Sequence, residues 1–318
     1  MNKIIPLLFF SLLIISCFSI GTLSAQDTTV LVVEFTGTID QSRWEFLQEA
    51  LQQAEVLDAE AVVLILDTPG GGLQETFDIA DAIQQSNIPV LGYVYPRGST
   101  AWSAGTFILL STHVAAMSPN TVIGSAQPVQ LSYLGTTPIN DSKTINALVE
   151  WLQERAHLYN RNSSVVSKFI TENLNMNETE ALDSNVIEII ATSVGDLLNQ
   201  ADGRMVTTSQ GAVNLSTAGA ELEVFTPSIK IQMLQLLSNP VLTSLLLILG
   251  ILAVFVGLQS PGFGAEVFGA VAIVLSLLGS SFGVSTLGMV CIVIGVILLA
   301  IEIFVTPGFG VIGIGAHN

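Results

Sequence analysis

Two short segments rich in small residues carry the side chains that could do chemistry. Residues 67–72 read DTPGGG, and residues 95–106 read YPRGSTAWSAGT. In the second segment Ser99, Thr100 and Ser103 precede or open a predicted helix, where the partial positive charge of the helix start favours an alkoxide or an oxyanion. A serine nucleophile is therefore one interpretation of this segment, and N-capping of the helix by the same hydroxyls is the other.

The glycines of the first segment favour a site built from backbone amides. Three consecutive glycines let the chain turn sharply and bring N–H groups close to a ligand. Neither G-x-x-x-x-G-K-S/T nor G-x-G-x-x-G occurs here, which excludes the usual phosphate loops. Amides that hold an oxyanion during acyl transfer fit the segment better.

A serine nucleophile needs a general base, and four side chains are candidates. His113 and His157 have no orienting acid nearby in the sequence. A lysine can accept a proton only as the neutral amine, which burial favours. Lys143 opens a predicted helix, where the dipole disfavours a cation, whereas Lys168 has the surroundings of a solvated helix charge.

Composition excludes several other kinds of site. The two cysteines, Cys17 and Cys291, both lie in apolar runs, so the polar part of the chain offers no disulfide or cysteine metal site. The three histidines lack ligand spacing, and we expect no metal and no cofactor. A net charge of −17 argues against nucleic acid as a partner.

The elements that must position these groups alternate between short apolar runs and helical stretches. Repeated β-α units of this kind predict right-handed crossovers and a mostly parallel sheet, with the ligand site beyond the carboxyl ends of the strands. We predict strands at 30–35, 61–66, 89–95, 114–117 and 186–190, and helices at 41–56, 73–85, 101–111, 142–159, 163–171 and 178–183.

The distribution of charge divides the chain into an acidic domain and an apolar block. After Lys230 only Glu266 and Glu302 carry charge. Residues 1–25 combine a basic start, an apolar run and small residues before a polar stretch, which predicts a signal peptide cleaved after Ala25. An uncleaved anchor and a lipid on Cys17 are the alternatives.

The apolar block, residues 241–318, predicts an all-α membrane domain. Three runs, 241–258, 265–282 and 286–305, are each long enough to cross a bilayer. Similar Pro-Gly turns follow the first and third runs. The connecting residues 204–240 predict a hairpin at 206–224 and an interfacial helix at 227–238.

These motifs together resemble the NfeD family of membrane-bound serine proteases, whose N-terminal domain has a Clp-protease/crotonase-like fold. The resemblance covers nearly the whole chain from about Val30 and depends on the order and spacing of its motifs. The matching stretches are DTPGG at 67–71, SAGT at 103–106, AMSP at 116–119, Ile123-Gly124, Pro128, EAL at 180–182 and the TPGFG-type turns of the membrane block.

The resemblance implies a role for each site residue. Ser103 corresponds to the nucleophile and Lys143, 40 residues later, to the general base of a Ser–Lys dyad. The amides of Gly70, Gly71 and Ala104 correspond to the oxyanion hole.

The predicted signal peptide puts the domain at 26–203 outside the cytoplasm, and the resemblance implies that it is a protease that cleaves hydrophobic segments of membrane-associated proteins. Stomatin-like proteins are the implied substrates or partners, membrane lipid surrounds the C-terminal domain, and the protease domain is a homodimer or larger. Family members usually carry a soluble domain after the membrane block, which is not part of this sequence. A catalytically silent scaffold that binds a stomatin-like partner is the alternative function.

Overall fold

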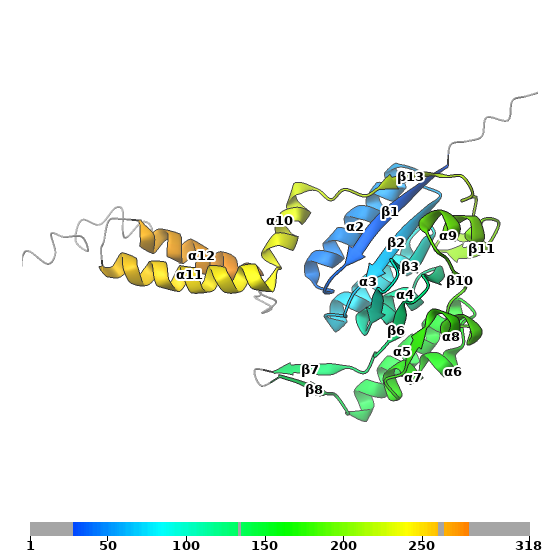
Figure 1. The fold of residues 1–318 in the computed structure, drawn as a ribbon, viewed down its shortest axis with the longest axis horizontal. Coiled ribbons are helices and arrows are strands. Elements are labelled where there is room, and N and C mark those ends of the chain that lie inside the picture. The colour runs from blue at the N-terminus through cyan, green and yellow to red at the C-terminus, as the bar shows by residue number, and fades with distance from the viewer. Residues whose placement is uncertain (1–27, 133–134, 260–263, 280–318) are drawn as a thin grey trace, which may run out of the picture.

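The computed structural model describes residues 28–132, 135–259 and 264–279. The predicted signal peptide, the third predicted span at 286–305, the second Pro-Gly turn and both cysteines lie outside the described residues. Figure 1 shows a globular α/β domain joined through one helix, α10, to a pair of long apolar helices.

A six-stranded sheet forms the centre of the globular domain, in the order β10-β5-β3-β2-β1-β13. Every pair in this sheet is parallel, which confirms the predicted parallel α/β architecture. Its strands are β1 (Thr29–Thr36), β2 (Ala61–Asp67), β3 (Val90–Val94), β5 (Val114–Met117), β10 (Ile189–Ile190) and β13 (Glu221–Val224). The central strands are buried on both faces, as continuous apolar runs require.

Helices cover both faces of the sheet. One face packs against α2 (Gln41–Val56), α3 (Leu73–Gln85), α4 (Ala104–Leu110) and α5 (Ser142–Leu158), and it holds the larger core. The other face packs against α9 (Val194–Ala201) and a short hairpin. This arrangement carries the residues after β2 and β3 to the same edge of the sheet.

The segment at 206–224 differs from the predicted single hairpin. The antiparallel hairpin consists of β11 (Met205–Thr208) and β12 (Gly211–Asn214) alone. The following strand, β13, joins the edge of the main sheet and pairs in parallel with β1. Its partner lies almost 200 residues earlier in the chain, so local turn residues could not reveal the pairing.

Besides the β11–β12 hairpin, the described residues form two further small sheets. The first contains β4 (Thr100–Trp102), β6 (Val122–Gly124) and β9 (Asn175–Asn177). The second is a hairpin of β7 (Val129–Ser132) and β8 (Gly135–Pro138), which projects from the domain in Figure 1. The short helices α6 (Ser163–Val166), α7 (Lys168–Thr171) and α8 (Glu178–Asp183) complete the domain.

The apolar block continues from α10 (Ile229–Leu237) into α11 (Pro240–Gln259) and α12 (Ala265–Gly279). Within the described residues α11 is the one helix long and apolar enough to cross a membrane, and α12 is apolar but shorter. Glycines let the two helices pack closely, because a Cβ at Gly250 or Gly269 would meet the backbone of the facing helix. The prediction of three spans is therefore not confirmed by the part of the chain that the structure describes.

Candidate functional site

Ser103 lies in the turn that joins β4 to α4. Its φ is +52° and its ψ is −116°, a conformation that is rare for a residue with a Cβ. The Ser103 N–H donates to the Gly124 carbonyl at 2.9 Å, whereas the side chain makes no cap hydrogen bond. The capping alternative therefore does not apply to this hydroxyl. Strained backbone of this kind is typical of a nucleophile held out from a strand-to-helix turn.

The two glycine- and serine-rich segments meet at Gly70. A Cβ on Gly70 would lie 2.7 Å from Ser103 Cβ and 3.1 Å from Ser103 Oγ. The φ of Gly70 is +114°, which also excludes most side chains. Glycine at this position therefore leaves the space that a substrate backbone needs beside the serine hydroxyl.

Of the described backbone amides around Ser103, one already donates a hydrogen bond and two do not. Gly70 N–H donates to Thr68 Oγ1 at 3.0 Å, so this predicted oxyanion donor is already occupied. The neighbouring Gly71 N–H and the Ala104 N–H at the start of α4 have no acceptor among the described residues. The Gly71 amide is held in place because its residue passes directly against the backbone of Ile39. Two amides are thus available to bind an oxyanion near Ser103.

Thr106 ties the strands and the helix around Ser103 together, a role that the sequence alone did not indicate. The Thr106 side chain is fully buried. Its Oγ1 lies 2.8 Å from the Ala101 carbonyl and 3.0 Å from the Gly124 carbonyl, and it accepts from Gly124 N–H at 2.9 Å. The same Gly124 carbonyl accepts from Ser103 N–H. One hydroxyl therefore connects β4, β6 and α4 at the turn that carries Ser103.

Removing the Thr106 hydroxyl should displace Ser103 without removing the Ser103 side chain or the amides beside it. We expect Thr106→Val to lower the rate of Ser103 acylation at least about tenfold, because a small displacement of a reacting group is costly. The free energy of unfolding should fall by about 1–3 kcal/mol, since a buried amide loses its acceptor. Thr106→Ser keeps the hydroxyl and should retain most of the acylation rate. Equal rates for the valine variant and the wild type would exclude this positioning role.

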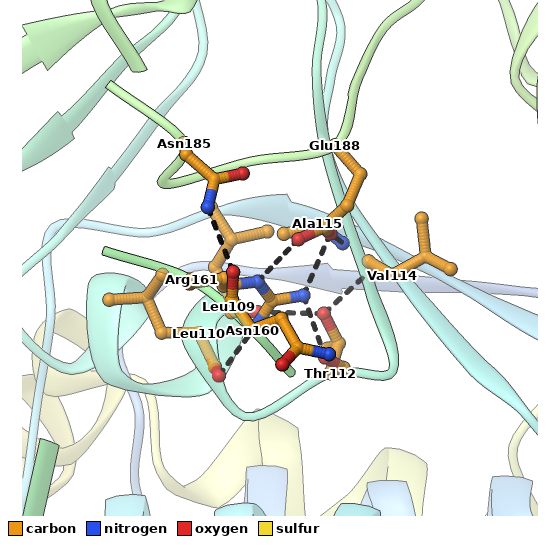
Figure 2. Close-up of polar contacts among 9 residues, drawn as sticks. All are labelled: Leu109, Leu110, Thr112, Val114, Ala115, Asn160, Arg161, Asn185 and Glu188. Atoms are coloured by element: carbon orange, nitrogen blue, oxygen red, sulfur yellow. Dashed lines mark hydrogen bonds and ion pairs between the residues drawn. The ribbon is translucent and has the colours of Figure 1, made fainter. Parts of the chain in front are cut away.

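The far end of α4 is held by Arg161. Its guanidinium donates to the carbonyls of Leu110 at 2.7 Å and Thr112 at 3.0 Å, and it forms two hydrogen bonds with Glu188. Glu188 Oε2 also accepts from the Ala115 N–H (Figure 2). A cation that caps the last carbonyls of a helix is favourable. The buried Arg161, paired with the partly exposed Glu188, is therefore a structural anchor that fixes α4, and with it the Ser103 turn.

Lys143 lies in the first turn of α5, as the sequence predicted, but its side chain is exposed. Asp141 caps this helix and accepts from the Thr144 amide and hydroxyl, which holds the pKa of the Asp141 carboxyl below its usual value. Within the part of the chain that the structure describes, no hydrogen bond joins Lys143 to Ser103. The described site thus brings Gly70, Gly71 and Ala104 to Ser103, but it does not bring Lys143 there.

The helix that carries Lys143 is nevertheless fixed relative to α4. Arg155 on α5 forms an ion pair with Asp81 on α3 at 2.7 Å and stacks on Trp151. Trp151 in turn packs against Phe107 on α4. The exposure of Lys143 is therefore not a consequence of a detached helix.

The two histidines are not placed as bases for Ser103. His113 is buried, and its Nδ1 accepts from the Val90 N–H at 3.0 Å. Burial lowers the pKa of His113 to about 4, with the nearby Arg161 charge acting in the same direction. His157 is exposed on α5. Neither histidine has a hydrogen bond with Ser103 among the described residues.

The lowered pKa of His113 predicts a pH-dependent stability. Between its ordinary pKa of 6.5 and about 4, the unfolded chain binds a proton that the folded chain does not, so stability falls as the pH falls through this window. The full effect is about 3 kcal/mol. Chemical denaturation at pH 7 and pH 4.5 should show this loss, and His113→Asn, which keeps an acceptor for Val90, should show less of it. His157→Asn is the matched control, and an equal slope in all three proteins would contradict the assignment.

The described residues contain no group of three or more His, Cys, Asp or Glu side chains that could hold a metal ion. The Ser103 turn offers a hydroxyl and two amides with no partner among the described residues, and a glycine that leaves room beside them. These features suit nucleophilic attack on a carbonyl.

Comparisons with known proteins identify both parts of the chain. The family model for the NfeD1b N-terminal domain matches residues 29–222, and the model for the NfeD integral membrane domain matches residues 241–317. The membrane-bound protease PH1510 of Pyrococcus horikoshii is 34% identical over 238 residues, which are 74% of this chain and 54% of the relative. The membrane protein NfeD1b of Bacillus subtilis is 28% identical over 296 residues, or 92% of this chain and 66% of the relative. This chain thus spans between half and two thirds of the length of these relatives.

Two solved structures of one protease domain share the fold. They are a serine-to-alanine mutant of the 1510-N membrane-bound stomatin-specific protease and a lysine-to-alanine mutant of it in complex with a substrate peptide. The first is 32% identical with a TM-score of 0.61 and covers 64% of this chain and 99% of its own. The second is 33% identical with a TM-score of 0.63 and covers 66% of this chain and 98% of its own.

Proposed function

The chain belongs to the NfeD family, and from this premise we propose that it is a membrane-anchored serine endopeptidase with Ser103 as its nucleophile. One observation carries the proposal. The Ser103 hydroxyl lies in a strained turn directly against Gly70, and neither it nor the amides of Gly71 and Ala104 has a hydrogen-bond partner among the described residues. This is the geometry that acyl transfer to a serine needs.

The proposed reaction uses groups of this chain alone. Ser103 Oγ attacks the peptide carbonyl while neutral Lys143 takes the hydroxyl proton. The Gly71 and Ala104 amides hold the oxyanion of the tetrahedral intermediate. Its collapse breaks the C–N bond, and the Lys143 ammonium gives the proton to the leaving amine. Water, deprotonated by Lys143, then attacks the acyl carbonyl, and the ester C–O bond breaks as the Lys143 ammonium returns the proton to Ser103 Oγ.

Lys143 must be covered before it can act as this base, because its side chain is exposed. The projecting β7–β8 hairpin immediately precedes α5. We propose that bound substrate, or the second copy in a homodimer or larger assembly, closes over this segment and brings Lys143 to Ser103.

The proposed substrates are hydrophobic segments of membrane-associated proteins, with stomatin-like proteins as substrates or partners. The stomatin specificity stated for the related protease supports this choice. The proposed topology puts the protease domain at 26–203 outside the cytoplasm, because residues 1–25 have the pattern of a signal peptide. The membrane domain at 241–318 then anchors the enzyme in lipid as a multi-pass segment.

A peptide library tests the proposed activity. The full chain in detergent micelles is incubated with peptides that differ in the length of an apolar stretch, and products are identified by mass spectrometry. We expect cleavage within or beside apolar stretches, and little cleavage of polar peptides. Binding of apolar peptides without any cleavage would instead support the second candidate function.

That second candidate is a catalytically silent membrane scaffold that binds a stomatin-like partner. The exposure of Lys143, with no described contact to Ser103, favours it. A fluorophosphonate probe distinguishes the two functions, since only an activated serine reacts with it rapidly. Labelling that is no faster than that of a surface serine would favour the scaffold.

A further inference from the structure

Helix α10 has two apolar sides, and within the described residues one of them is covered. Ile231 is 2% exposed and belongs to the main core, with Leu234 packed beside it. On the other side Ile229, Met233 and Leu236 are 75%, 54% and 53% exposed. Their i, i+4, i+7 spacing puts these three side chains in one line, which we call the outer stripe.

Polar contacts fix the direction in which the outer stripe faces. Ser228 caps α10, and its N–H and hydroxyl bind the Glu49 carboxylate at 2.6 and 2.7 Å. Lys230 Nζ lies 2.8 Å from Glu45 Oε2. Both carboxylates belong to α2, so rotation of α10 would break these contacts and expose Ile231. The outer stripe therefore faces away from the globular domain.

The outer stripe lies next to the ends of both apolar helices. Asn239 caps α11 through a hydrogen bond from the Val241 N–H at 2.9 Å. Gly279, the last residue of α12, packs directly against the Leu237 backbone of α10. Figure 1 shows α10 between α2 and these two helices.

The surface of α11 indicates what surrounds the point where α10 meets α11 and α12. Its side chains are apolar all round, and eight of them are more than half exposed, from Val241 to Val256. A helix with such a surface needs a hydrocarbon environment. The outer stripe thus lies where the hydrocarbon must end and the polar headgroups begin.

We propose that α10 lies in the interface of the bilayer and inserts its outer stripe, so that the α2 side of the globular domain is held at the membrane surface. The stripe carries no charge, and Lys230 is already paired with Glu45, so the lipid contact is apolar and does not need anionic headgroups. Three side chains are also too few for a stable interface with a second copy, which needs about 800 Å² per partner. This inference goes beyond peptidase activity and holds whether or not Ser103 is a nucleophile.

Fluorescence in vesicles tests the contact. The full chain, with Cys17→Ser and Cys291→Ser, carries a single cysteine at Met233 (M233C) and is labelled with an environment-sensitive dye. Met205→Cys is the control, because Met205 is 65% exposed and belongs to the β11–β12 hairpin, on the face of the sheet opposite α2. After reconstitution into phosphatidylcholine vesicles, a lipid-borne nitroxide near the headgroups should quench the dye at 233 at least about threefold more than the dye at 205.

The alternatives give different results in the same samples. Equal quenching at both positions would overturn the proposal. Quenching at 233 that appears only when phosphatidylserine is added would overturn the apolar character of the contact. Efficient cross-linking of two chains through position 233, without lipid quenching, would assign the outer stripe to an interface between copies.

Discussion

Ser103→Ala should abolish turnover and leave the fold intact. The substitution removes only the Oγ atom, which makes no cap hydrogen bond, so the free energy of unfolding should change by less than about 1 kcal/mol. Peptidase activity should fall by at least about 10³, because the residual rate then comes from binding and the oxyanion amides alone. Turnover of an apolar peptide, together with chemical denaturation, measures both effects.

Two neighbours provide the controls for this experiment. Ser99 is buried, and Thr100 lies in β4, where its N–H donates to Asp67 Oδ1 at 3.0 Å. Neither lies in the strained turn between β4 and α4 that carries Ser103, so Ser99→Ala and Thr100→Ala should keep most of the activity. If either one silences the enzyme while Ser103→Ala remains active, the nucleophile is misassigned.

A substitution at Gly70 tests the need for space beside Ser103 without removing the serine hydroxyl. Gly70→Ala would put a Cβ within 2.7 Å of Ser103 Cβ on a backbone with positive φ. Ser103 would then have to move although its hydroxyl is kept, so we expect Gly70→Ala to lower activity through lost space alone. The two segments lie together because β2 and β3 pair in parallel and end at the same edge of the sheet.

Local patterns predicted the parts of the fold that depend on local physics. The apolar runs of β2 and β3 and the periodic helices α2, α3 and α5 follow from side-chain spacing, because burial of those faces drives their formation. The position of β13 depends on pairing with β1, and the strand β4 depends on its neighbour β6. No nearby residue determines either pairing.

In the candidate site, too, the features that depend on local sequence could be predicted, and those that depend on distant strands could not. Glycines and small residues indicated backbone amides, and the resemblance indicated which serine matters. The hydroxyl of Thr106 acts only once β6 is in place, since its partners include Gly124. The Thr68 hydroxyl, by contrast, bonds locally to the Gly70 amide. Thr106 stood in the recognised SAGT stretch, but a threonine at a helix start has too many ordinary roles to be assigned from sequence.

Lys143→Arg should remove acylation as completely as Lys143→Ala. A guanidinium remains protonated throughout the working range, so arginine can keep the charge but cannot accept the serine proton. We expect the rate of labelling by a fluorophosphonate to fall by about 10² or more in both variants, because the proton must leave before attack.

The chain offers a matched control for this substitution. Lys168 is also exposed at the start of a helix and forms only a long i,i+4 contact of 3.9 Å with Glu172. Lys168→Arg should therefore leave labelling and turnover unchanged. Denaturation of all three variants excludes a loss of fold, since no described contact of Lys143 contributes to the core.

The labelling of Lys143→Arg also bears on the choice between a serine peptidase and a catalytically silent scaffold. His113 cannot replace the lysine, because its Nδ1 already accepts from Val90 and its lowered pKa of about 4 makes it a weak base. An active Lys143→Arg enzyme would therefore require a base from outside the described site, and the Ser–Lys mechanism would be wrong. Loss of labelling in Lys143→Arg, with Lys168→Arg unaffected, would mean that an exposed side chain reaches Ser103 during the reaction. That result would support the proposed closure, in which bound substrate or a second copy covers the start of α5 and brings Lys143 to the serine.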